Sequence, residues 1–204
     1  MKNNKLQILF STAIILLISG SRLIPHTANF VPVFAMILFA SVHLKNKWNA
    51  IFISIGALWL SDLYINNWGS SAIFFDQYDA VTGQLLVDNF IFFNSPVQYL
   101  AYILIAFLGI QIFKNSISLP KVFASSLLAG VAFFLVSNFG VWLSGTMYPL
   151  SLDGLLSCYI AAIPFFRATL ASNIFFSSIL FGGYYLLQKD VHFLKLRHIK
   201  YSKF

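Results

Sequence analysis

The chain contains no glutamate and only one cysteine, and charged side chains make up just 9% of its 204 residues. An ordinary soluble domain carries roughly 25% charged residues. Hydrophobic residues account for 59% of the chain, and its mean hydropathy is +0.80. This composition argues against a water-soluble globular protein. The single cysteine excludes an intrachain disulfide and any CxxC metal or redox motif.

Motifs typical of enzyme active sites are also absent. The sequence has no nucleophile elbow, no HExxH, no phosphate-binding loop and no GxGxxG. We therefore predict a protein that is not an enzyme and has no catalytic residue, cofactor or resident metal. Cys158 and His26 are the weak candidates for a soft metal, but they lie 132 positions apart without ligand spacing. A lone cysteine is more often a small buried hydrophobe.

Long apolar runs occupy most of the chain. A membrane-crossing helix needs about 20 apolar residues, so the length allows roughly five to seven crossings. We predict an all-α, polytopic membrane protein, a single domain over residues 1–204 with six transmembrane helices in one bundle. The predicted spans are residues 6–20, 30–44, 48–65, 96–113, 122–143 and 168–187.

The first span has an alternative interpretation. Lys2 and Lys5 precede a short apolar core, as in a signal peptide. The small residues Ser19, Gly20 and Ser21 would then form the cleavage site, although Arg22 follows at once. Retention gives six spans, and cleavage gives five without inverting the others.

The net charge of +7 is distributed in a way that predicts orientation rather than nucleic-acid binding. Most basic residues fall in four clusters that border hydrophobic runs: Lys2 and Lys5; Lys45 and Lys47; Lys114 and Lys121; and Lys189, Lys195, Arg197, Lys200 and Lys203. Cytoplasmic loops carry such an excess. We therefore predict a multi-pass protein of the bacterial plasma (inner) membrane with both termini cytoplasmic. The basic tail, residues 189–204, is expected to contact anionic lipid of the bilayer.

Two segments between the spans are candidates for the outer surface. Residues 68–95 contain three Asp and no Lys or Arg, which predicts an external loop able to act as a lid. Residues 137–173 combine many polar side chains with Gly and Pro. Irregular backbone at membrane depth survives only where protein or a water-filled cavity covers it. We expect this stretch to close the outer end of the bundle, with a short amphipathic or re-entrant segment at residues 155–163.

Polar residues at these outer ends form the predicted solute-binding site. The candidates are Arg22, His26, Asp62, Asn66, Asn138, Trp142, Tyr148, Asp153, Arg167 and Asn173. Ionisable groups are costly in hydrocarbon and therefore face a bundle interior or cavity. The planar fork of arginine suits a carboxylate or phosphate, and a carboxylate could carry a coupling ion.

Each of these groups also has a structural interpretation. The arginines could pair internally with Asp62 or Asp153, or snorkel to lipid head groups. Trp142 and Tyr148 could belong to the aromatic belt at the membrane interface.

Four segments carry a family resemblance: RLIPHTANFVPVFA, SDLYINN, SNFGVWL and CYIAAIPFFRATLASN. They resemble a family of small bacterial integral membrane proteins of unknown function described as transport proteins. That family is similar in turn to the substrate-binding S components of energy-coupling factor (ECF) transporters, which capture vitamins or related micronutrients. The resemblance implies six helices, an outward binding site and a transmembrane coupling subunit with ATPases as partner. The first span lacks the alanine-rich small-xxx-small face with which many S components dock that subunit.

We accordingly predict a membrane transport protein that binds a small polar or amphipathic solute at the outer face for uptake. One alternative is a membrane-embedded enzyme that uses His26 and Asp62 on a lipid-linked substrate. Another is a non-catalytic accessory membrane subunit, in which the polar residues only hold helices together.

Overall fold

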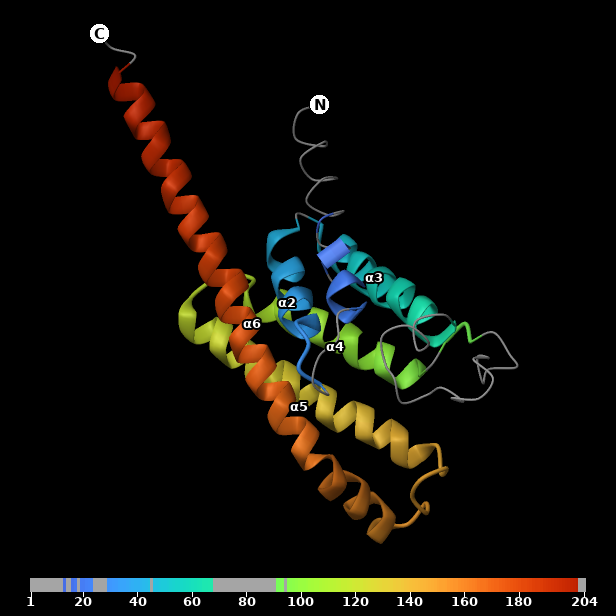
Figure 1. Cartoon of the computed structure of the whole chain (residues 1–204). Coiled ribbons are helices and arrows are strands. Elements are labelled where there is room, and N and C mark those ends of the chain that lie inside the picture. Colours follow the sequence, from blue (N-terminus) through green and yellow to red (C-terminus); the bar gives the residue numbers. More distant parts are fainter. Residues whose placement is uncertain are drawn as a thin grey trace, which may run out of the picture.

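A computed structural model of the chain describes residues 13, 16, 17, 19–23, 29–44, 46–67, 91–93 and 95–201; the side chains of residues 50 and 187–201 are excepted. Every regular element in this part of the chain is an α-helix, as predicted. The labelled helices are α2 (Val33–His43), α3 (Lys47–Asn67), α4 (Pro96–Ile112), α5 (Leu119–Leu143) and α6 (Leu152–Tyr201) (Figure 1). The described positions from 13 to 23 are helical as well.

Short connections make consecutive helices antiparallel. Residues 44–46 join α2 to α3, residues 113–118 join α4 to α5, and residues 144–151 join α5 to α6. One end of the bundle, called the hairpin end below, therefore holds the starts of α2, α4 and α6 and the ends of α3 and α5 (Figure 1).

The short helix α2 is the centre of the bundle and contacts α3, α4, α5 and α6. Seven of its 11 residues are buried, among them Ile37 and Leu38 with no exposed surface. A helix that is apolar all round belongs in an interior. At 1.5 Å per residue α2 is only about 16 Å long. A non-helical segment, residues 29–32, precedes it at the hairpin end. Ser172 Oγ of α6 holds that segment by donating to Val31 O at 2.6 Å.

Glycine allows two close helix contacts in this core. A side chain at Gly109 of α4 would collide with Ser41 Oγ of α2, and one at Gly130 of α5 would lie 2.7 Å from Leu170 Cδ2 of α6. Small residues at helix interfaces let backbones approach closely in membrane bundles. The packing of α4 on α2 and of α6 on α5 therefore depends on these two positions.

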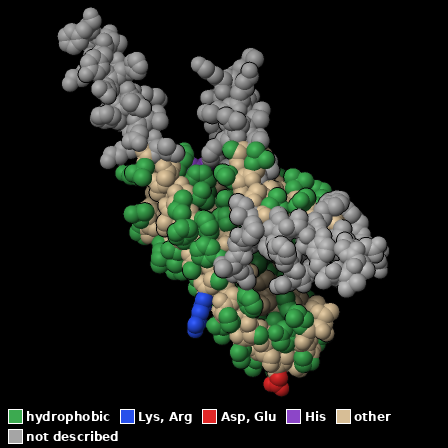
Figure 2. Space-filling view, in the orientation of Figure 1, with side chains coloured by type: hydrophobic (Ala, Val, Ile, Leu, Met, Phe, Trp, Pro, Cys, Tyr) green, Lys and Arg blue, Asp and Glu red, His purple; other side chains and the backbone are tan. Residues whose placement is uncertain are grey.

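Three of the described helices are long and apolar enough to cross a membrane: α3, α5 and residues 152–186 of α6. The helices α2 and α4 are apolar but shorter. Large hydrophobic side chains such as Phe123, Leu135 and Phe175 are about half exposed, and the described surface in Figure 2 is almost devoid of charge. Soluble proteins rarely expose apolar patches of this extent. The fold is thus that of a helical membrane protein.

The helix α6 departs from the sequence prediction. A span at residues 168–187 preceded by a separate re-entrant segment at 155–163 was expected, whereas α6 runs without interruption from Leu152 and includes Pro164. The re-entrant prediction is wrong. A proline breaks one backbone hydrogen bond, but a non-helical stretch in lipid would leave many more groups unsatisfied, so the continuous helix is favoured.

Other predictions fall outside the described residues. These are most of the first span at 6–20, including the question of its cleavage, nearly all of the expected lid at 68–95, and His26.

Candidate functional site

A buried ion pair joins the segment around Arg22 to α3 near the hairpin end. Arg22 Nη2 lies 2.5 Å from Asp62 Oδ1, and the two side chains are only 16% and 9% exposed. Arg22 Nη1 also donates to Ser61 Oγ at 2.6 Å and to Leu58 O at 3.1 Å. From α4, the Tyr99 hydroxyl donates to Asp62 Oδ2 at 2.5 Å. The carboxylate is thus compensated from two sides, as a buried charge requires.

A cavity of about 150 Å³ lies against this pair, between the start of α2 and helices α4, α5 and α6. Its lining residues are Arg22, Asn29, Val31, Val33, Phe34, Gln98, Tyr102, Phe133 and Thr169. Charged, amide and hydroxyl groups therefore converge on one small space beside apolar residues, which is the usual make-up of a small-molecule site.

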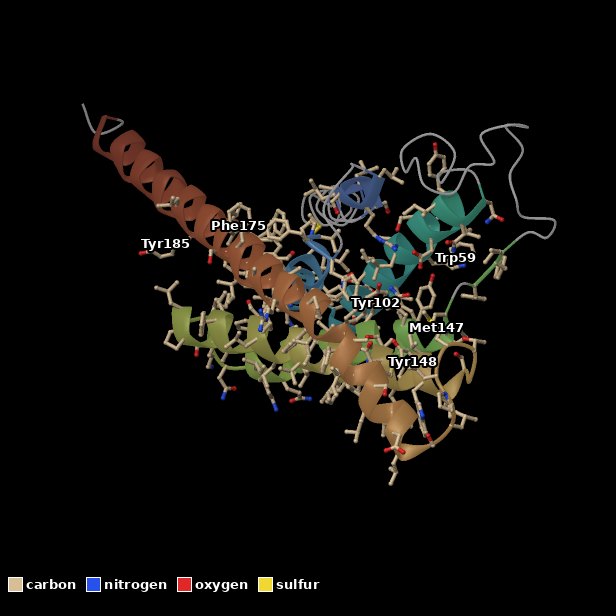
Figure 3. The ribbon with its side chains drawn as sticks, turned by 60° about the horizontal axis from the view of Figure 1, so that its bottom comes forward. Trp59, Tyr102, Met147, Tyr148, Phe175 and Tyr185 are labelled. Carbon is tan, nitrogen blue, oxygen red and sulfur yellow. The ribbon has the colours of Figure 1, made fainter. Side chains whose placement is uncertain are left out.

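Three aromatic rings form the apolar wall of the cavity. The ring centroids of Phe34 and Phe133 are 4.6 Å apart, and Tyr102 stacks nearly parallel to Phe133 at 5.9 Å. Gln98 Nε2 donates to the Tyr102 hydroxyl at 2.5 Å, and Tyr102 lies within the bundle (Figure 3). The cavity thus has a hydrophobic side and a hydrogen-bonding side, so it suits an amphipathic molecule.

The predicted residues of the first half of the chain meet near this cavity. Arg22 lines it directly, and Asp62 holds Arg22 without itself being among the lining residues. Asn66 is half-buried one turn further along α3 and does not line the cavity.

The predicted residues of the second half lie elsewhere. Asn138 Nδ2 donates to Phe134 O within α5, and Trp142 Nε1 donates to Pro149 O at 3.1 Å. Tyr148 lies on the α5–α6 connection (Figure 3). The other two, Asp153 and Arg167, are exposed on α6.

For Trp142, Tyr148 and Asp153 the reason for this separation is the length of the α5–α6 hairpin, whereas Arg167, two residues before Thr169, lies on the exposed side of α6. From Phe133 at the cavity, α5 continues for ten residues, about 15 Å. From its start, α6 takes 17 residues, about 25 Å, to reach Thr169 at the cavity. The polar residues near the tip of the hairpin therefore stand well away from the cavity.

Asn173 occupies a third place, one turn after Thr169 at the α5–α6 contact. It is fully buried, and its Nδ2 donates to Ser126 O at 3.2 Å, while Oδ1 has no hydrogen-bond partner among the described residues. It is not among the residues that line the cavity. The contact joins two helices, so its geometry is that of a structural amide.

Cys158 has a structural environment as well. It is buried, and its Sγ donates to Asn138 O at 3.4 Å. Within the described ranges no three His, Cys, Asp or Glu residues are grouped closely enough to hold a metal ion.

Of the residues that line the cavity, sequence reasoning selected only Arg22; the polar residues that it missed are Asn29, Gln98, Tyr102 and Thr169. A usable signal existed for Gln98 and Tyr102, which are polar residues at i and i+4 in the first turns of an otherwise apolar helix. Thr169 shares a face with the selected Asn173. Asn29 carries no comparable signal, since its place depends on a backbone φ of 60° in the segment before α2.

Comparison with known proteins gives one result. No curated protein and no solved structure matches the chain. The model of one protein family, described as "Family of unknown function (DUF6580)", matches residues 2–196 and so covers nearly the whole chain. The chain therefore belongs to the DUF6580 family, whose function is unknown.

Proposed function

We propose that this protein is a six-span transport protein of the bacterial inner membrane, with both termini cytoplasmic. In this proposal it binds a small polar or amphipathic solute at its outer face for uptake, in the manner of an ECF S component. The shorter helices α2 and α4 supply two of the spans, and the helical segment that includes residues 19–23 supplies the first.

The observation that carries the proposal is the cavity beside Arg22. It combines a guanidinium, two amides, two hydroxyls and an aromatic wall within about 150 Å³. Ionisable groups placed inside a membrane bundle are usually functional. A site of this make-up near one end of the bundle is what a solute-binding membrane protein requires.

The distribution of lysine supports an outward-facing cavity. Lys47 begins α3, Lys114 follows α4, and Lys121 lies in the first turn of α5, so all three are at the end of the bundle opposite the hairpin end. Lys and Arg mark the cytoplasmic side. The cavity, near the hairpin end, then opens toward the outside of the cell.

The cavity offers binding groups rather than reactive ones. Its described lining contains no Ser, Cys, His, Asp or Glu, the side chains that most often supply a nucleophile or an acid–base pair. The chain also lacks an ATPase motif. Energy for uptake would come from an ion gradient or from a transmembrane coupling subunit with ATPases.

Native mass spectrometry of the full chain extracted in mild detergent tests the proposal. We expect a bound small molecule of unchanged chemical structure, and faster accumulation of that molecule by cells that overproduce the protein. Absence of a bound molecule together with unchanged accumulation would refute a transport role. Conversion of a labelled lipid by the purified protein would instead show an enzyme.

A second candidate function, an accessory subunit, is favoured by one observation: the charge of Arg22 is already compensated by Asp62. In that case Arg22→Gln would disturb assembly with a partner subunit while no solute bound to either form. A solute that binds the wild-type protein but not the Arg22→Gln variant would exclude the accessory role.

A further inference from the structure

We propose that the solute is a small carboxylate, a monoanion whose carboxyl group lies between Arg22 and the first turn of α2. This inference rests on the proposed function, because it names the class of molecule that the cavity accepts.

Arg22 supplies the first half of the anion site. It lines the cavity, whereas its partner Asp62 holds it from α3 and is not part of the lining. Ser61 Oγ and Leu58 O fix the same guanidinium through Nη1. The arginine is therefore positioned by α3 and presented to the cavity, and a planar guanidinium is suited to a carboxylate.

The start of α2 supplies the second half. Its N-cap is Pro32, with no side-chain cap, and the first bonded amide of the helix is that of Met36, which donates to Pro32 O. The amides of Val33, Phe34 and Ala35 have no acceptor among the described residues, although all three residues are at most 5% exposed. A buried helix end without partners is unusual and calls for an acceptor.

The position of these amides points to the cavity as the source of that acceptor. Val33 and Phe34 both line it, so the first turn of α2 borders the same space as Arg22. Transporters use the N-termini of interrupted membrane helices in this way to hold anionic groups of their substrates.

The charges around the cavity disfavour a cation and a multiply charged anion. Arg22 and Asp62 cancel, and no other charged residue belongs to the described lining. The helix dipole adds roughly half a positive charge at the start of α2. A cation is repelled by this partial charge, a monoanion is attracted to it, and a second negative charge on the ligand would find no partner in the described lining.

The volume and the aromatic wall define the rest of the molecule. A cavity of about 150 Å³ holds a molecule the size of benzene, about six non-hydrogen atoms. The rings of Phe34, Tyr102 and Phe133 would contact a short apolar chain. Propionate and lactate have the required size, and propionamide and lactamide are their neutral counterparts of equal shape.

The test is thermal unfolding of the full chain in detergent with each of these four molecules, against sodium chloride at equal ionic strength. We expect the unfolding temperature to rise with the logarithm of the concentration of at least one carboxylate above its dissociation constant. The matched amide should produce no comparable shift. An equal or larger shift with the amides would overturn the carboxylate assignment while leaving solute binding intact. No shift with any probe, and no bound molecule in mass spectrometry, would overturn both proposals.

Variants locate the site. Arg22→Gln combined with Asp62→Asn removes both charges at once and leaves neither uncompensated, so this protein is expected to fold; the carboxylate-specific shift should disappear. Arg167→Gln makes the same chemical change at an exposed position outside the cavity and should retain the full shift. A full shift in the double variant, or an equal loss in Arg167→Gln, would overturn the assignment of the site.

Discussion

The ion pair between Arg22 and Asp62 gives the sharpest prediction about stability. Two single variants, Arg22→Gln and Asp62→Asn, and their combination form a double-mutant cycle. Each single change removes one charge from a pair whose side chains are 16% and 9% exposed. The remaining charge stays buried without its partner, whereas the double variant leaves no charge at all.

The expected magnitudes follow from the contacts of each partner. Breaking a buried pair by removing one member costs about 3–5 kcal/mol. The lower end applies here, because Asp62 keeps the Tyr99 hydroxyl and Arg22 keeps Ser61 Oγ. We therefore expect a loss of about 3 kcal/mol for each single variant and a smaller loss, about 1–2 kcal/mol below that, for the double variant, which has no unpaired charge. Because the double variant loses less than either single variant, the measured losses should be clearly non-additive.

The measurement is the free energy of unfolding in mixed micelles titrated with sodium dodecyl sulfate and followed by far-ultraviolet circular dichroism. Independent sites add to within about 0.5 kcal/mol. Additive losses within that margin would refute the pair as a stabilising contact at this position.

Three further predictions concern packing and the hairpin. Gly109→Ala should destabilise the bundle by about 1–3 kcal/mol because the added methyl group has no room against α2, whereas Gly56→Ala, facing open space, should be neutral or stabilise by up to about 1 kcal/mol. Trp142→Phe removes the indole donor that ties α5 to residues 149 and 151, so limited proteolysis should cut the connection at 144–151 faster. Asn173→Ala should cost about 0.6–1.7 kcal/mol, the range of side-chain hydrogen bonds between membrane helices, and should leave solute binding unchanged.

The outcomes that would contradict these predictions are specific. Equal effects at Gly109 and Gly56 would show that α4 and α2 are not in close contact. An unchanged cleavage rate in Trp142→Phe would mean that the indole does not restrain the connection. Loss of solute binding in Asn173→Ala, with stability retained, would place that amide in the binding site.

The helical class and most helix positions could be predicted from the sequence, because long apolar runs bounded by lysines or prolines have only one stable form in lipid. The prediction for residues 96–113 matches α4 to within one residue. The error at α6 came from treating Gly154 and Pro164 as breaks. Inside a long apolar helix, however, a proline loses one hydrogen bond while the rest of the ladder holds.

The candidate site was harder to predict, because the residues that meet there are set by how deep each lies in the bundle. Asp62 and Arg22 could be selected as costly charges in apolar surroundings, and the structure brings them together. Trp142 and Asp153 are equally polar in sequence, yet they stand near the tip of a hairpin that extends beyond the cavity. Sequence periodicity gives the face on which a residue lies, but not how far a helix projects relative to its neighbours.

The helix α6 has a mechanical consequence for the whole molecule. Its 50 residues form a rod of about 75 Å, more than twice the thickness of the hydrocarbon layer. Thr169 in the cavity wall and Lys189, 20 residues further along the chain, belong to this one helix. Pro164, the point at which a helix bends most readily, lies five residues before Thr169. A change in the tilt of α6 at the cavity would therefore be carried along one helix to the end of the bundle opposite the hairpin end.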